Sequence, residues 1–187
     1  MSKVKIDNNA FTYPMPMTLV GAMVGDRPNF LAVAWVTRVN YKPPMIAVTL
    51  SKTHHTSPGI HASRAFSVNV PSVDLIEETD YCGIVSGKKK DKSGLFTVFN
   101  GEITGAPMIG ECRISMECRL VQTVDLQADE LFIGEIVGTY ADSECLTKGE
   151  PDMIKVDPFV LTMPDNNYCR IGAKVGAAWS IGKKLKG

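Results

Sequence analysis

Apolar and polar residues alternate along several stretches of the chain, a pattern that predicts half-buried strands. In residues 112–120 every even-numbered position is apolar and every odd-numbered position is polar. Residues 66–70 show the same alternation, with Ser67 and Asn69 between apolar neighbours. Both segments are therefore predicted to be strands with one face toward a core and one face toward solvent.

Short continuous apolar runs predict further strands, because a strand buried on both faces carries no polar alternation. Residues 45–50 and 131–137 are such runs, and residues 19–24, 30–39 and 159–163 are further candidates. The sequence Gly25-Asp26-Arg27-Pro28-Asn29 is rich in turn formers and predicts a hairpin between residues 19–24 and 30–39. Six or seven strands with turn-like spacing indicate a mainly β barrel or sandwich.

Two segments are expected to be helical. Ser57 and Pro58 provide an N-cap and a first-turn proline, and predict a short helix that ends near Arg64. A second helix is expected to start at Ser72 or Asp74 and to end near residue 83.

The length of 187 residues fits one domain, residues 1–187, in which residues 173–187 are a Gly- and Lys-rich C-terminal tail. Twenty Lys and Arg residues balance 20 Asp and Glu residues, so the chain lacks the basic surplus of a typical nucleic-acid binder. The polar N-terminus and the absence of a long apolar run argue against a signal peptide or a membrane anchor. Five cysteines without a CxxC motif indicate reduced thiols and a cytoplasmic protein.

Several common sites are excluded by spacing. Residues 83–88 resemble a P-loop, but they have three spacer residues between the glycines and no Ser or Thr after the lysine, and they do not form a GxSxG elbow. No GxGxxG motif follows a predicted strand. His54, His55 and His61 lack metal-ligand spacing, so we expect exposed loop histidines, no metal site and no catalytic side chain.

Two segments have the residue types of a ligand site. Residues 51–58, Ser-Lys-Thr-His-His-Thr-Ser-Pro, lie between a predicted strand and a helix start, where free N–H groups and hydroxyls can bind phosphate. An ordinary N-cap with solvated polar neighbours explains the same residues. In residues 32–37, alanines precede Trp35, which suits either a flat aromatic ligand or a core tryptophan. The run of residues 88–92 is a basic loop or an additional cationic part of such a site.

These segments occur in a characteristic order. The sequence contains, in order, an Asn29 turn, Ala34-Trp35-Val36-Thr37, Pro43-Pro44-Met45, Ser51 to Thr56, residues 65–71, Lys92, Glu117-Cys118, residues 131–135 and residues 168–172. In this respect it resembles the flavin reductase-like family of FMN-binding split barrels, and within it the flavoredoxin branch. The resemblance covers roughly residues 11–172.

The resemblance implies a six-stranded antiparallel split β-barrel of Greek-key topology, a homodimer, and FMN bound without a covalent link. It places Asn29 and Trp35 at the flavin, and the backbone of Trp35, Val36 and Thr37 along its ring. By the same carry-over, Ser51, Lys52 and Thr56 hold the phosphate, and Lys92 provides a charge-assisted hydrogen bond to the cofactor. Relatives often have a histidine immediately before the strand at residues 131–135, where this chain has Asp129-Glu130.

The expected function is that of an FMN-dependent oxidoreductase. Two forms are open: flavoredoxin-like electron transfer, with a ferredoxin-type or other redox protein as partner, or an NAD(P)H-dependent flavin or acceptor reductase. The alternatives are a flavin-binding or storage protein without catalysis on the same fold, and a structural dimer without a ligand. No nucleic-acid or membrane partner is expected.

Overall fold

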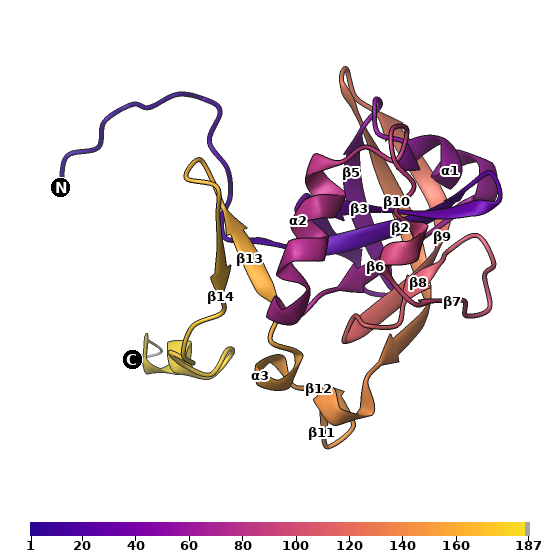
Figure 1. Cartoon of the computed structure of the whole chain (residues 1–187). Helices are drawn as coiled ribbons and strands as arrows, with labels where there is room; N and C mark the ends of the chain where they lie inside the picture. Colours follow the sequence, from indigo (N-terminus) through magenta and orange to yellow (C-terminus); the bar gives the residue numbers. More distant parts are fainter. Residues whose placement is uncertain (186–187) are drawn as a thin grey trace.

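Seven antiparallel strands form the central sheet (Figure 1), and a computed structural model describes them within residues 1–185. Their order across the sheet is β3-β2-β6-β9-β10-β5-β4. The bounds are β2 Thr18–Val24, β3 Arg27–Val33, β4 Val36–Asn40, β5 Met45–Ser51, β6 Ala65–Val70, β9 Ile114–Asp125 and β10 Asp129–Ala141. The strands predicted at residues 19–24, 45–50, 66–70, 112–120 and 131–137 thus exist, and the mainly β class is confirmed.

The two edge strands of this sheet, β3 and β4, are consecutive in the chain and are separated only by Ala34 and Trp35. A linker of two residues cannot span an open seven-stranded sheet, so the sheet must curl until its edges meet, as a barrel requires. Residues 30–39 were predicted as one strand, and the structure corrects this. The N–H of Val36 donates to the carbonyl of Ala34 at 3.1 Å, and this tight turn ends β3 and turns the chain toward β4.

The barrel interior is filled by apolar side chains that the inward faces of the strands contribute. Val20, Val48, Phe66, Val68 and Phe132 are all fully buried there. Burial of each such side chain contributes about 1.5–3 kcal/mol. These side chains therefore form the core that stabilises the barrel.

The polar faces of β6 and β9 are also buried, contrary to the expectation of half-buried strands. They carry Ser67, Asn69, Ser115 and Glu117. The segment between residues 96 and 112 lies over them and contains β7 Val98–Phe99 and β8 Met108–Ile109. Its backbone bonds the covered side chains: Asn69 Oδ1 accepts from the N–H of Ile109 at 3.0 Å.

Glu117 is the charged residue of this covered face and is fully buried. Its carboxylate accepts hydrogen bonds from the N–H of Glu102 at 3.2 Å, the N–H of Ile103 at 2.9 Å and the hydroxyl of Tyr140 at 2.8 Å. Three donors compensate the burial of a carboxylate, so Glu117 anchors the covering segment.

Two helices lie against the barrel. Helix α1, Thr56–Ser63, starts earlier than predicted, with His55 as its N-cap. Ser57 is not the cap, because its hydroxyl donates to the carbonyl of Ser51 at 3.3 Å inside the first turn. Helix α2, Ile76–Ile84, follows a 3-10 turn, Val73–Leu75, and packs on β3 (Figure 1). No helix within residues 1–185 is long and apolar enough to cross a membrane.

A smaller sheet lies beside the barrel (Figure 1), with the order β1-β13-β14. Its strands are β1 Met15–Pro16, β13 Phe159–Thr162 and β14 Asn167–Arg170. The connection from β10 contains β11 Leu146–Thr147, β12 Glu150–Pro151 and α3 Met153–Val156. The N-terminal arm points away from the body, and a 3-10 turn, Ile181–Leu185, ends the described tail. Residues 186 and 187 of the predicted tail lie outside the described part.

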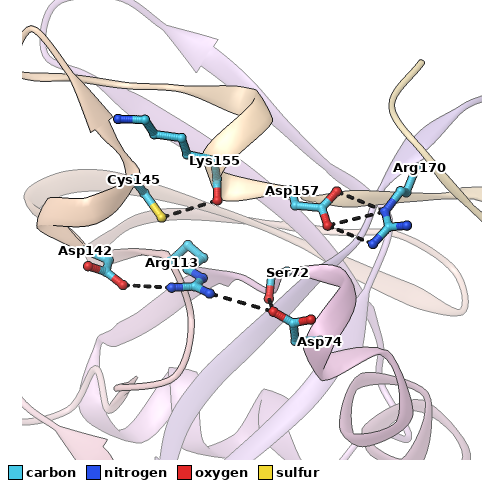
Figure 2. A network of polar contacts seen from close by, with 8 residues as sticks. All are labelled: Ser72, Asp74, Arg113, Asp142, Cys145, Lys155, Asp157 and Arg170. Carbon is cyan, nitrogen blue, oxygen red and sulfur yellow. Dashed lines mark hydrogen bonds and ion pairs between the residues drawn. The ribbon is translucent and has the colours of Figure 1, made fainter. Parts of the chain in front are cut away.

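Polar contacts lie where the chain leaves the barrel and within this extension (Figure 2). Arg113 pairs with Asp142 at 2.9 Å and reaches Asp74, just before α2, at 3.7 Å. Arg170 of β14 pairs with Asp157 at 3.1 Å.

The contacts to α2 and the 3-10 turn before it are made by Tyr168 of β14, whose hydroxyl donates to the carboxylate of Asp80 at 2.8 Å, and by the carbonyl of Asp157, which accepts from the N–H of Val73 at 3.0 Å. They hold the small sheet next to α2, and with it β1, which lines a cavity described below.

Candidate functional site

Asn29 and Thr56 form the first pair of the predicted site. The hairpin turn is only Gly25 and Asp26, so Asn29 lies within β3 and not in a turn as predicted. Its side chain is buried, and its Nδ2 donates to Oγ1 of Thr56, the first residue of α1, at 2.8 Å. The resemblance places Asn29 at the flavin with Trp35, but the structure places it beside Thr56, 27 positions along the chain, and it lines neither cavity at Trp35.

Lys92 is the buried cation of the site, only 3% exposed. Its Nζ donates to the carbonyls of Cys82 at 3.1 Å and Val85 at 2.8 Å, at the C-terminal end of α2. Carbonyls at a helix C-terminus carry partial negative charge and suit a cation. Burial lowers the pKa of Lys92, and no carboxylate within residues 1–185 is in ion-pair distance of it.

An ammonium has three N–H donors, and these two carbonyls use two of them. Lys92 lines a cavity of about 130 Å³, here called the helix cavity. Its other lining residues are Asn29, Leu31, His54, His55, Thr56 and residues 83–87. The N-terminus of α1 has no side-chain cap, so its N–H groups add to the donors at this cavity. The helix cavity thus combines a cation, hydroxyl and amide groups in a form suited to an anion.

Trp35 borders two further cavities and is 48% exposed. The first, here called the tryptophan cavity, has about 250 Å³ and is lined by residues 32–35, Thr49, Leu50, Ser51, His54 and Asp129. The second, here called the outer cavity, has about 340 Å³ and is lined by Thr12, Met15, Pro16, residues 34–37, Ala47, Thr49 and Leu131. The predicted core tryptophan is therefore excluded, and a wall for a flat ligand remains.

The cavities form a row along β3. Ala34, Trp35 and Thr49 line both the outer and the tryptophan cavity, and His54 lines both the tryptophan and the helix cavity. Beyond the helix cavity lies the basic cavity of about 380 Å³, bordered by Arg27 and residues 87–92. The row therefore changes from apolar at Trp35 to cationic at Lys92.

Of the eight predicted residues, Lys52 is the one that lines none of these cavities. Its ammonium pairs with Asp125 and donates to the carbonyl of Gln127 at 3.4 Å, at the hairpin between β9 and β10. Ser51 does line the tryptophan cavity, where its hydroxyl bonds Thr53 at 2.9 Å. The geometry thus groups Asn29, Thr56 and Lys92 and separates Lys52 from them.

The expectation of exposed loop histidines is wrong for His54 and His55, which are half-buried and line these cavities. Burial lowers the pKa of His54, against the smaller effect of Asp129, which raises it. The sequence contained one signal for this: both histidines follow a buried strand and precede a helix start, as Ser51 and Thr56 do. Asp129 faces the tryptophan cavity at the start of β10, opposite Ser51 in the register.

Comparison with known proteins gives consistent results. A family model described as flavin reductase like domain matches residues 10–172. The crystal structure of flavoredoxin from Methanosarcina acetivorans superposes with a TM-score of 0.97 at 50% identity, covering 99% of this chain and 100% of that one. Flavoredoxin of Desulfovibrio vulgaris (Miyazaki F) gives 0.87 at 36% identity, covering 96% and 100%.

A protein with a split barrel domain from Shewanella frigidimarina superposes with a TM-score of 0.76 at 21% identity, covering 87% of this chain and 84% of that chain. At this identity the likeness concerns the fold alone. It confirms the predicted split barrel.

Proposed function

The chain belongs to the flavin reductase-like family, and from this premise we propose that it binds FMN non-covalently and acts as a flavoredoxin-like redox protein. Bound FMN supplies the hydride and electron transfer chemistry, while the protein binds, orients and tunes it. No side chain needs to act as a nucleophile in such a protein.

One observation carries the proposal: the buried ammonium of Lys92 lines the helix cavity with two carbonyl partners and no acidic partner within residues 1–185. A buried cation without an acidic partner is costly unless a counter-charge reaches it. Thr56 and Asn29 lie at the same cavity, and the uncapped start of α1 adds N–H groups. A phosphate satisfies all of these donors at once.

The other end of the row fits the flavin ring. The tryptophan cavity is walled by Ala32, Val33, Ala34 and Trp35, and the small side chains of the two alanines leave room for a flat ring beside the indole. Because His54 connects this cavity to the helix cavity, one molecule with a ring at one end and a phosphate at the other fills both. FMN has this shape, and the residues present therefore fit it.

Electrons can reach the flavin in two ways. In an NAD(P)H-dependent reductase a nicotinamide must lie beside the flavin ring, and the outer cavity of about 340 Å³ next to Trp35 supports this form. In an electron carrier a ferredoxin-type or other redox protein supplies the electrons. The basic residues 88–90 and Arg27 near the phosphate end favour an acidic partner in that case.

We propose a homodimer as the working unit. The arms of the chain expose large apolar side chains: Val4, Ile6, Val175, Trp179 and Leu185 are each at least 69% exposed. Large apolar side chains become buried when such arms pack against a second copy of the chain.

We also propose that the protein works in a reducing, cytoplasmic setting. All five cysteines are free thiols, which supports this proposal.

The function is tested by reconstituting the protein with FMN, removing free flavin, and adding NADH, NADPH or reduced ferredoxin without oxygen. Bleaching of the flavin band by a nicotinamide supports the reductase, and bleaching by ferredoxin alone supports the carrier. A protein that keeps FMN but is reduced by none of the donors is a flavin-storage protein. A protein that retains no FMN contradicts the proposal.

A further inference from the structure

We propose that His54 is a cofactor-binding residue, and that its Nδ1 forms a hydrogen bond to the ribityl chain, the polyol between the ring and the phosphate of bound FMN. The inference rests on the proposed function and names a contact that the predicted set of eight residues lacks. It follows from the place of His54 among the cavities and from the state of its ring nitrogen.

The place of His54 is defined by the two cavities that FMN would fill. Among their lining residues, His54 is the one that the tryptophan cavity and the helix cavity share. A ligand with its ring beside Trp35 and its phosphate beside Lys92 must pass His54 with the segment in between. In FMN that segment is the hydroxylated ribityl chain.

The ring nitrogen Nδ1 of His54 is buried and has no hydrogen-bond partner within residues 1–185. Buried polar atoms are nearly always paired, so an unpaired nitrogen on a residue that lines a cavity is where a ligand group can complete the pairing. The other such atom in the described chain is Oγ1 of Thr123, on β9, which lines none of these cavities. The unpaired nitrogen thus belongs to the residue that lines both cavities of the proposed FMN site.

The surroundings favour a neutral imidazole. Burial lowers the pKa of His54, and the cations Lys92 and Lys88 act in the same direction. Asp129, at the start of β10, raises the pKa by less than burial lowers it but by more than either lysine does, and His55 lines the same helix cavity. A neutral imidazole both donates and accepts one hydrogen bond, and a hydroxyl does the same, so either tautomer of His54 finds its complement in a polyol.

The test compares His54→Asn and His54→Leu with the wild type by flavin fluorescence titration. The amide of Asn keeps a polar group near the position of Nδ1, whereas Leu removes it. We expect the FMN dissociation constant to rise about 3- to 10-fold in His54→Leu, the value of one net hydrogen bond, and to recover in His54→Asn. The matched control is His61→Leu, because His61 is bonded to Glu130 at 2.9 Å and lines none of the cavities.

Two flavin probes locate the contact. Riboflavin has the ribityl chain without the phosphate, and lumiflavin has neither. The loss in His54→Leu is expected with FMN and riboflavin and not with lumiflavin. Equal loss with all three probes, or unchanged affinity in a variant with wild-type thermal unfolding, overturns the inference. If the wild type itself binds no FMN, the proposed function fails instead, so the two failures are distinguishable.

Discussion

Replacing Lys92 with methionine removes the buried ammonium and keeps most of the side-chain volume. In the unliganded protein this leaves the carbonyls of Cys82 and Val85 without their donor, which costs about 1–3 kcal/mol each. The change also removes the cost of burying a charge, so part of that loss is offset. We expect the variant to fold with moderately reduced stability.

The effect on FMN is larger and more specific. The free donor of Lys92 would form a charge-assisted hydrogen bond to the phosphate, worth about 1.5–3 kcal/mol. This corresponds to an FMN dissociation constant that is about 10- to 150-fold higher. Riboflavin lacks the phosphate, so its affinity should change much less. The wild-type preference for FMN over riboflavin should therefore shrink in Lys92→Met.

The assay is a titration of flavin fluorescence with FMN and riboflavin at constant ionic strength. Lys174→Met is the matched control, since Lys174 is exposed in the tail. Lys52→Met tests whether Lys52 binds the phosphate. The resemblance predicts that this variant loses as much FMN affinity as Lys92→Met, whereas the structure, in which Lys52 lines none of the cavities, predicts a small loss. An FMN affinity within twofold of wild type in folded Lys92→Met, or an equal loss for both flavins, refutes the reasoning.

Three further predictions concern other parts of the molecule. In Trp179→Phe the remaining tryptophan is Trp35, and FMN should quench its fluorescence. In Trp35→Phe the remaining tryptophan is Trp179, which is 96% exposed in the tail, and FMN should hardly quench it. Strong quenching in Trp35→Phe contradicts the site. Glu117→Gln should lower the free energy of unfolding in urea by about 2–4 kcal/mol, since three buried donors lose a carboxylate, and a loss below about 1 kcal/mol would show that they do not depend on it. In Gly87→Ala the added Cβ would overlap Oδ1 of Asn29 at the helix cavity, so the variant should bind FMN more weakly than the control Gly94→Ala, in which the added Cβ meets nothing within 4 Å. Equal FMN affinity of the two variants argues against that cavity as the site.

Local patterns determined much of the fold in advance. Period-two alternation at residues 66–70 and 112–120 and the apolar runs at 45–50 and 131–137 correspond to four strands of the barrel. The order of motifs then selected a split barrel among β folds. The pattern did not show that the polar faces of β6 and β9 are covered, because a covering loop is a long-range contact that leaves no periodicity.

The sequence indicated most of the residues that line the cavities, but it did not indicate how their side chains are arranged. Thr56 and Lys92 line one cavity, whereas Asn29, which the resemblance places at the flavin beside Trp35, lies in a strand and bonds Thr56 at that cavity. The direction of a side chain depends on which partner is close by. The ammonium of Lys52 points to Asp125, which is distant in the sequence, and so Lys52 lines none of the cavities. His54 was missed for the related reason that its burial depends on β3, β10 and the loop after α2 together.

The central claim is that the row of cavities from Trp35 to Lys92 is an FMN site. Its most direct measurement is an equilibrium titration of FMN with the flavin-free wild-type protein, followed by flavin fluorescence. The account predicts saturable quenching with one FMN per chain and a yellow protein after removal of free flavin. Flavin that stays fully fluorescent at protein excess, and a colourless protein after desalting, would contradict it.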